Sequence, residues 1–283
     1  MDDPELTLPS PAKINRFLHV VGRRGDGYHQ LQTLFQFLDQ GDRMTFIANA
    51  RGDILREDRH EFMLPDCDLS VAAATLLRET AGQPELGATI ILEKNIPPGS
   101  GLGGGSSNAA TTLLALNRLW DLDLSTSELL QIGRRLGADV PIFIHGRAAW
   151  AEGVGDELSH CTVDEPWLAL LLPPVTVSTA GIFGDPNLQR QHKSISMADF
   201  SAGRSGNDLE PVTFSRHPEV ARAHEYLANY GAARMSGSGG AVFVPLDSRV
   251  AAERVVAGAP PSVRGFCSRA CNRSPLSPHL DRG

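Results

Sequence analysis

Segment 97–108 has the residue types of a phosphate-binding loop. Five glycines fall within positions 99–105, and two serines follow them. Leucines at helical spacing come next, which indicates a helix beginning where the loop ends. Backbone N–H groups and the positive end of a helix dipole bind phosphate at such a junction. We therefore expect a nucleotide or phosphate site here, with Ser106 or Ser107 capping the helix.

Other interpretations of this loop fit the sequence less well. A flexible linker would not end in cap residues followed by an apolar helical stripe. A Walker A loop requires Gly-Lys-Ser/Thr after the glycines, and that triplet is absent. The dinucleotide-binding fingerprint requires a final Gly or Ala where Ser106 stands, and an acidic residue about 20 positions later. Phosphate binding of a different type is the interpretation that remains.

Lys13 and Asp139 are charged residues in positions that call for an explanation. Lys13 lies among apolar neighbours in a stretch that alternates like a strand, where an unpaired charge is costly. It is either paired or a solvent-exposed residue at a strand edge. Asp139 precedes Val-Pro at a turn into a short apolar run. The pattern alone favours a helix N-cap for it.

Length and composition limit the class of protein. The chain has 283 residues, 41% of them hydrophobic, enough for one large or two ordinary domains. Its net charge of −7 argues against a general nucleic-acid or membrane-surface binder. The four cysteines have no paired zinc spacing, so we expect reduced thiols and a cytoplasmic location. Residues 1–11 do not resemble a signal peptide, and no apolar run is long enough for a membrane span.

The elements that position these residues follow from hydrophobic periodicity. Strands are predicted at 12–22, 28–38, 44–47, 88–93, 147–152, 167–172, 241–244 and 263–270. Helices are predicted at 69–79, 106–119, 126–135, 218–230 and 248–257, with Ser125 or Thr126 capping the third of them. Because strands and helices do not alternate strictly, the class predicted is α+β. We place a domain boundary near residues 155–165, giving domains 1–158 and 159–283.

Three motifs in order carry a family likeness. They are Ser-Pro-Ala-Lys-Ile-Asn at 10–15, the glycine-rich loop at 98–110, and Ser-Gly-Ser-Gly-Gly at 236–240. Together they resemble the GHMP kinases, which phosphorylate small alcohols. The resemblance implies an N-terminal ATP-binding α/β domain with one left-handed βαβ crossover. It further implies a C-terminal ferredoxin-like domain, with the active site in the cleft between the two.

Further motifs narrow the resemblance. They are Gly-Asp-Gly-Tyr-His at 25–29, Leu-Gln-Thr-Leu-Phe at 31–35 and Gly-Ala-Asp-Val-Pro at 137–141. They look like those of family members in the non-mevalonate isoprenoid pathway that act on the cytidine diphosphate ester of 2-C-methyl-D-erythritol. The implied reaction is ATP-dependent phosphorylation of its 2-hydroxyl, with Mg²⁺ as cofactor. The implied partners are these small molecules, with no nucleic acid and no membrane, and the chain would be a monomer or a weak homodimer.

The resemblance also implies roles at the phosphate end of the site. Asp139 would be the catalytic base, and Lys13 would pair with it and offset charge near the attacking oxygen. Asp68 stands where the family typically has an asparagine near the adenine, and it cannot donate an amide N–H. A serine hydroxyl would reach the metal, whose direct ligands the sequence does not identify. The ATP-binding residues implied are Pro98, Gly99, Ser100, Gly101, Leu102, Gly103, Gly104, Gly105, Ser106, Ser107, Asn108 and Asp68.

At the other end of the site the resemblance implies recognition of the cytidine substrate. Aromatic faces stack on a pyrimidine, and an imidazole can read its hydrogen-bonding edge. Taken singly, each of these aromatic residues could equally be part of the core, and the 236–240 loop could be a simple hairpin turn. The substrate-binding residues implied are Asn15, Tyr28, His29, Thr179, Phe183, Ser236 and Gly237.

Two other functions remain open at this point. One is a homoserine or mevalonate-type kinase of the same family, which gives no reason for the Tyr28-His29 pair. The other is a catalytically inactive metabolite-binding regulator on the same fold. The presence of both Lys13 and Asp139 gives inactivity no support.

Overall fold

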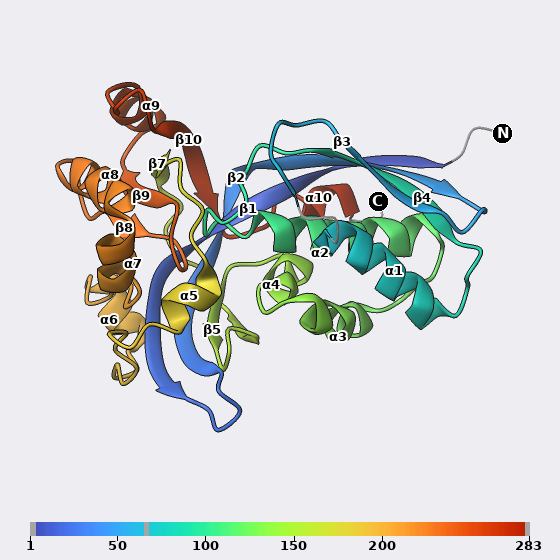
Figure 1. Cartoon of the computed structure of the whole chain (residues 1–283), viewed down its shortest axis with the longest axis horizontal. Coiled ribbons are helices and arrows are strands. Elements are labelled where there is room, and N and C mark those ends of the chain that lie inside the picture. The colour runs from blue at the N-terminus through green and yellow to red at the C-terminus, as the bar shows by residue number, and fades with distance from the viewer. Residues whose placement is uncertain (1–3, 65–67, 281–283) are drawn as a thin grey trace.

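The computed structural model describes residues 4–64 and 68–280 of the chain. Cys67 and the neighbouring Asp66 lie outside these ranges, whereas Cys161, Cys267 and Cys271 are free thiols. Figure 1 shows two parts joined by long strands, with the helices α1 to α4 in one part and α5 to α9 in the other. No helix in the described ranges is both long and apolar enough to span a membrane.

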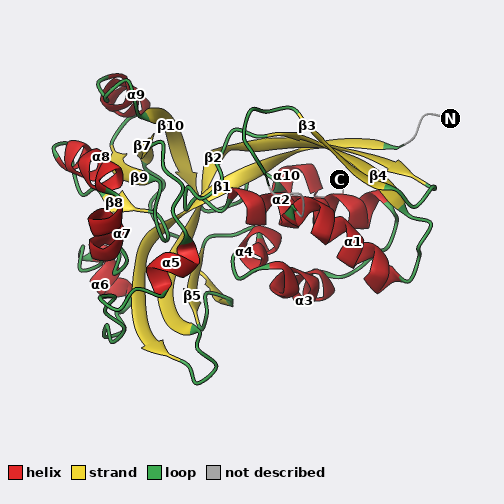
Figure 2. Cartoon of the chain, in the orientation of Figure 1, coloured by secondary structure: helices red, strands yellow, loops and turns green. Residues whose placement is uncertain are grey.

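One sheet runs through both parts of the molecule. Its strand order is β3-β4-β2-β10-β7-β9-β8, with β1 and β5 also paired to β2, and β6 paired to β5. The strands are β1 (Glu5–Arg23), β2 (His29–Asn49), β3 (Ile54–Asp58), β4 (Gly87–Glu93), β5 (Ala149–Glu152), β6 (Glu157–His160), β7 (Trp167–Leu172), β8 (Arg234–Met235), β9 (Val242–Leu246) and β10 (Arg264–Cys271). The long antiparallel pair β1–β2 connects the two parts (Figure 2).

The first part packs helices against one face of the sheet. Its helices are α1 (Leu69–Ala81), α2 (Gly104–Leu119), α3 (Thr126–Leu136) and α4 (Val140–His145). Alternate residues of β2, such as Met44 and Phe46, meet Leu113 and Leu116 of α2 in a buried cluster. This burial of apolar surface fixes the start of α2 relative to β1. The parallel pair β3–β4, joined through α1, is a βαβ crossover; its left-handed sense stays a prediction.

The second part has a ferredoxin-like arrangement, as predicted. Its strands β7, β8, β9 and β10 lie in the order β10-β7-β9-β8, and all of these pairs are antiparallel. Helices lie between β7 and β8 and between β9 and β10, which gives the order βαββαβ. The helices are α5 (Thr179–Phe183), α6 (Met197–Ser201), α7 (Glu210–Arg216), α8 (Pro218–Ala228) and α9 (Arg249–Ala257).

The final helix, α10 (Ser277–Leu280), returns to the first part. Leu276 and Leu280 pack against the core that contains α1 to α4. The residue range 159–283 therefore includes side chains that pack with both parts, and the boundary at residue 158 stays a prediction. The two-domain α+β class predicted from the sequence is confirmed.

The predicted helix at 106–119 is present, but its predicted serine cap is wrong. Helix α2 begins at Gly104, and its N-cap is Gly103, which has no side chain to form a cap hydrogen bond. Ser106 and Ser107 lie inside the first turn. By contrast, Ser125 caps α3 in a full capping box with Glu128, as the sequence indicates.

A buried polar network holds the first turn of α2 on the sheet. Lys94 Nζ donates to Asp42 Oδ2 at 2.7 Å and to Asn108 Oδ1 at 2.9 Å. Asp42 also accepts the backbone N–H groups of residues 95 and 96 and the Asn108 amide. Asn108 Nδ2 donates to Ser10 Oγ, which itself donates to Ser107 Oγ. Each buried charge thus has at least two hydrogen-bonding partners, the condition under which such groups are tolerated.

Removing the buried cation should cost much more stability than removing an exposed one. We expect Lys94→Met to lower the free energy of unfolding by about 3 kcal/mol, because it leaves the Asp42 carboxylate buried without its counter-ion. Urea unfolding measures this. The matched control is Arg59→Met, whose exposed pairing with Glu93 at 4.0 Å should contribute less than about 1 kcal/mol. Equal losses in the two variants would contradict the prediction.

Candidate active site

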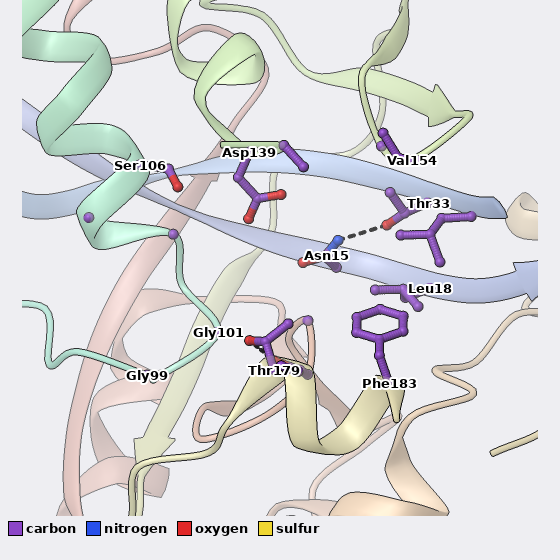
Figure 3. Close-up of a pocket in the computed structure, with 18 of the residues that line it drawn as sticks. Asn15, Leu18, Thr33, Gly99, Gly101, Ser106, Asp139, Val154, Thr179 and Phe183 are labelled. Atoms are coloured by element: carbon purple, nitrogen blue, oxygen red, sulfur yellow. Dashed lines mark hydrogen bonds between the residues drawn. The ribbon is translucent and has the colours of Figure 1, made fainter. Parts of the chain in front are cut away.

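A cavity of about 840 Å³ lies where the two parts of the molecule meet. It is lined by β1 and β2, the glycine-rich loop with the first turn of α2, the turn before α4, and α5. In Figure 3, Ser106 and Asp139 lie on one side of Asn15, and Thr179 and Phe183 lie on the other. The volume is sufficient for a nucleotide-sized ligand.

The start of α2 forms the end of the cavity at which the sequence predicts phosphate binding, here called the phosphate end. Gly104, Gly105 and Ser106 are its first three residues and line the cavity, so their backbone N–H groups have no partner within the helix. Gly103 has φ 71°, and a Cβ there would lie 2.9 Å from Phe143 Cζ and 3.0 Å from Lys13 Cε. Only glycine brings the loop this close to Lys13. The 16-residue helix adds its dipole at this end.

Lys13 and Asp139 form an ion pair beside these N–H groups. Lys13 Nζ lies 3.1 Å from Asp139 Oδ2, and the lysine side chain is 3% exposed while the aspartate is 35% exposed. Asp139 occupies the N-cap position of α4, yet its carboxylate forms no cap hydrogen bond. Of the two possibilities that the pattern left open for Lys13, the structure shows the paired one. The carboxylate is thus directed to the lysine and the cavity instead of to the helix.

A short hydrogen-bonded chain continues from this pair along β1 and β2. Lys13 Nζ donates to Asn15 Oδ1 at 2.7 Å, and Asn15 Nδ2 donates to Thr33 Oγ1 at 2.9 Å (Figure 3). The Thr33 hydroxyl donates in turn to the Phe17 carbonyl. Because a lysine can only donate, the amide oxygen of Asn15 must face Lys13. These hydrogen bonds fix the side chains of Lys13 and Asn15, which reach the centre of the cavity.

The far end of the cavity carries aromatic groups. Tyr28 ends the turn between β1 and β2, His29 begins β2, and Phe183 ends α5. The rings of His29 and Phe183 lie 5.1 Å apart, whereas Tyr28 is 66% exposed. Burial lowers the pKa of His29, and the positive charges of Arg190 and Arg23 lower it further. A neutral imidazole beside aromatic faces can bind a planar heterocycle.

The second glycine-containing loop approaches the cavity between α5 and β1. Ser238 Oγ lies 2.8 Å from Thr179 Oγ1, and both residues line the cavity together with Gly237. Ser236 is buried behind them, where its hydroxyl donates to the Gly101 carbonyl and accepts the Asn15 N–H. The two loops therefore support each other.

The structure does not bring every predicted residue to the cavity. Leu102 is buried in the core, and Ser107 and Asn108 belong to the Asp42–Lys94 network. Asp68 caps α1 by accepting the Ser70 N–H and lies 3.7 Å from Arg56. The predicted residues that do line the cavity are Lys13, Asn15, Tyr28, His29, Pro98, Gly99, Ser100, Gly101, Gly103, Gly104, Gly105, Ser106, Asp139, Thr179, Phe183 and Gly237.

Sequence reasoning also missed residues of the site. Thr33 lies within the 31–35 motif and Ser238 within the 236–240 motif, so each belonged to a recognised segment without an assigned role. Leu18 and Val154 form apolar parts of the lining. For Leu18 the strand pattern alone indicates a core residue.

Among the described residues, one cluster could supply three metal-ligating side chains, and it is not in the cavity. His19, His192 and Asp208 place their ligand atoms within 4.8 Å of one another. The two imidazoles stack at 3.6 Å with an 11° angle between their planes. Because nitrogen lone pairs lie in the ring plane, stacked rings do not both point at one ion. As arranged, the cluster is a packing contact between β1 and segment 192–208.

Comparison with known proteins identifies the family. The family models "GHMP kinases N terminal domain" and "GHMP kinases C terminal" match residues 68–147 and 187–260. A 4-diphosphocytidyl-2-C-methyl-D-erythritol kinase from Thiobacillus denitrificans is 47% identical, over 95% of this chain and 96% of its own length. The chain belongs to the 4-diphosphocytidyl-2-C-methyl-D-erythritol kinase family. It is a kinase of the GHMP superfamily.

Solved structures agree with this assignment. A crystal structure of 4-(cytidine 5'-diphospho)-2C-methyl-D-erythritol kinase is 32% identical to this kinase, with a TM-score of 0.79 over 94% of this chain and 99% of its own. A mevalonate kinase structure, 15% identical, has a TM-score of 0.71 over 95% of this chain and 100% of its own. The second similarity concerns the fold alone.

The His19 cluster should make this kinase less stable in acid. Burial and His192 lower the pKa of His19 from 6.5 to about 4, against an opposing effect of Asp208. The unfolded chain binds this proton near pH 6.5 and the folded chain only near pH 4, so stability is lost as the pH falls through that interval. Urea unfolding at several pH values should show this loss, and His19→Gln, which still can accept the Gly206 N–H, should reduce it. Parallel curves for parent and variant would contradict the prediction.

Proposed function

We propose that this kinase transfers the γ-phosphoryl group of ATP to the 2-hydroxyl of 4-diphosphocytidyl-2-C-methyl-D-erythritol. The observation that carries the proposal is the Lys13–Asp139 pair, 3.1 Å apart, beside the free N–H groups of α2. Family membership supports the identity of the substrate. Phosphoryl transfer to an alcohol requires positioned phosphates, charge stabilisation and a group that accepts the hydroxyl proton.

Each requirement has a residue in the cavity. The N–H groups of Gly104, Gly105 and Ser106 hold phosphate oxygens at the helix N-terminus. The Asp139 carboxylate accepts the proton from the attacking hydroxyl, and the Lys13 ammonium offsets negative charge between the carboxylate and the phosphoryl group. Asn15, fixed by Lys13 and Thr33, orients the substrate alcohol.

Mg²⁺, when bound, neutralises phosphate charge and orients the phosphates for transfer. The cavity lining includes the carboxylates of Asp139 and Asp26 and the Ser106 hydroxyl, and among the described residues it holds no cluster of three His, Cys, Asp or Glu side chains that could ligate one ion. This donor set fits an ion that is held mainly by phosphates and water, as Mg²⁺ often is. A cytoplasmic location and the monomer or weak homodimer remain predictions.

The aromatic end of the cavity favours the cytidine substrate over other alcohols of the superfamily. Phe183 and Tyr28 offer ring faces to a pyrimidine, and His29 offers its edge. Homoserine and mevalonate carry no heterocycle, so these residues would have no function toward them. Thr179 and Ser238, between the aromatic end and α2, are in position to bind the linking diphosphate.

The test of this proposal is coupled ADP release with Mg-ATP. We expect turnover of about 1–100 s⁻¹ with 4-diphosphocytidyl-2-C-methyl-D-erythritol and none with homoserine or mevalonate. Free CDP should compete with the substrate at millimolar concentration or below. Turnover of another alcohol instead would support kinase activity but contradict the proposed cytidine-binding site. Absence of turnover on all three alcohols would reject the proposal.

Replacing the proposed base should greatly slow catalysis without unfolding the protein. We expect Asp139→Asn to lower kcat by about 10³-fold or more, because the amide cannot accept the hydroxyl proton. The variant keeps the side-chain shape and an oxygen that can accept from Lys13, so the protein should still fold, with a lowered unfolding midpoint because the buried Lys13 loses its counter-ion. A matched control is Asp164→Asn, which removes an exposed carboxylate paired with Arg16. Near-normal turnover of Asp139→Asn would exclude Asp139 as the base.

A further inference from the structure

Thr213 of α7 directs its hydroxyl group away from its own helix. A threonine inside a helix commonly donates to the carbonyl four residues earlier, as Thr112 does to Asn108 in α2 at 2.8 Å. Thr213 Oγ1 instead donates to the Ser238 carbonyl at 2.9 Å. Thr213 is fully buried and does not line the cavity, whereas Ser238 does. The hydroxyl group of Thr213 therefore connects α7 with a residue of the site.

The backbone around Ser238 depends on support from outside the loop. Its neighbours Gly237 and Gly239 have positive φ angles of 59° and 121°. Because glycine restricts the backbone least, the local sequence does not fix the peptide groups on either side of the Ser238 Cα. Asn207 Nδ2 donates to the Gly237 carbonyl at 2.8 Å, which holds the peptide group before Ser238. Thr213 holds the peptide group after it.

Thr213 also restricts the loop by direct packing. A Cβ on Gly239 would lie 2.7 Å from Thr213 Cγ2, so the loop backbone lies directly on the threonine methyl group. Within the loop, the peptide group after Ser238 donates its Gly239 N–H to the Ser236 carbonyl at 3.2 Å. This peptide group is thus bonded once within the loop and once to α7. Without the Thr213 hydroxyl it would be bonded only to a loop that can itself rotate about its glycines.

Helix α7 is fixed against β8, the strand that precedes this loop. Leu209 and Val212 are buried in one apolar cluster with Met235 of β8. Glu210 Oε1 accepts the Met235 N–H at 2.9 Å. The position of Thr213 relative to the loop is therefore set by packing and by a hydrogen bond to the strand.

The direction of the Ser238 hydroxyl follows from the two peptide groups that flank its Cα. Ser238 Oγ lies 2.8 Å from Thr179 Oγ1, and both residues line the cavity. Two hydroxyl groups held side by side can donate to oxygens of one phosphate group. A group that is held in its binding position before the ligand arrives loses less conformational freedom on binding, which raises affinity.

We propose that Thr213 is a positioning residue for substrate binding: its hydroxyl group holds the peptide group after Ser238, so that the Ser238 hydroxyl faces Thr179 and binds the diphosphate of the substrate. The proposal rests on the proposed function for the identity of that diphosphate. It extends the site to a buried residue of α7 that does not line the cavity.

A double-mutant cycle, measured by calorimetry with CDP, tests whether Thr213 acts through Ser238. We expect Thr213→Val, which keeps the side-chain shape, and Ser238→Ala each to weaken CDP binding by about 10-fold. The double variant should bind CDP no more weakly than Ser238→Ala, because a hydroxyl that has been removed cannot be misplaced. Additive losses, an unchanged affinity in either single variant, or a parent that does not bind CDP would overturn the proposal.

Rescue and kinetics provide a second test. Thr213→Ser keeps the hydroxyl group and should bind CDP within a few-fold of the parent. With 4-diphosphocytidyl-2-C-methyl-D-erythritol, Thr213→Val should raise the KM for this substrate by about 10-fold, with the KM for ATP and kcat within a few-fold. A change confined to kcat, or a failure of Thr213→Ser to restore CDP binding, would contradict the assigned role. If CDP binding follows the expected cycle but no alcohol is phosphorylated, the role of Thr213 stands and the proposed reaction fails.

Thr112→Val is the matched control. Both threonines are fully buried and donate to a backbone carbonyl, but Thr112 donates within its own helix. We expect Thr112→Val to leave the affinity for CDP unchanged, and urea unfolding of both variants shows how much stability each has lost. A loss of CDP affinity equal to that of Thr213→Val would show that general destabilisation is the cause, and would overturn the assignment to Thr213.

Discussion

The position of the Lys13 ammonium group is the constraint on which the active site depends. The side chain lies on a buried strand, and a charge there requires acceptors close by. One acceptor, Asn15, lies two residues along the same strand, while the other, Asp139, comes from the turn between α3 and α4. Satisfying the ammonium therefore fixes the distance between β1 and the α3–α4 turn. The start of α2 lies between β1 and α4, where Gly103 is next to Lys13 and Phe143.

Two buried lysines, Lys94 and Lys13, lie near the start of α2 and have different roles. Lys94 is fully paired with Asp42 and Asn108, and a Cβ on Gly104 would lie 3.3 Å from its Nζ. It stabilises the start of α2 and does not line the cavity. Lys13 is paired with a carboxylate that is partly exposed to the cavity. One cation thus stabilises the start of α2, and the other lies at the cavity, where it could act on the phosphates that we propose bind there.

At the aromatic end of the cavity, hydrogen bonds also hold residues from distant segments together, but none of them is an ion pair. His29 follows the turn between two long strands, and Phe183 ends a short helix of the other part. Arg190 connects them by hydrogen bonds to a ring nitrogen and to backbone carbonyls. Because β1 and β2 extend through both parts, the turn reaches α5 while the same strands carry Lys13 and Asn15. The distance between the phosphate end and the aromatic end is set by the strands.

Local sequence was sufficient for most of the longer elements and for many of the residues that line the cavity. The predicted strands 28–38 and 44–47 are a single strand, β2, and the short elements β3, β6 and α5 to α7 were not predicted. The glycines of 99–105 and the helix after them, the capping box at Ser125 and the need of Lys13 for a partner are properties of neighbouring residues, which sequence patterns report directly. The motif resemblance supplied Asp139, which the local pattern favoured only as a cap. Only the tertiary structure decided which loop residues face the cavity. Ser106 does so, whereas Ser107 and Asn108 turn toward Ser10 and Asp42, because strand packing against the helix selects one side of its first turn. The contact of Arg190 with His29 had no local signal either, since it depends on how two distant segments pack.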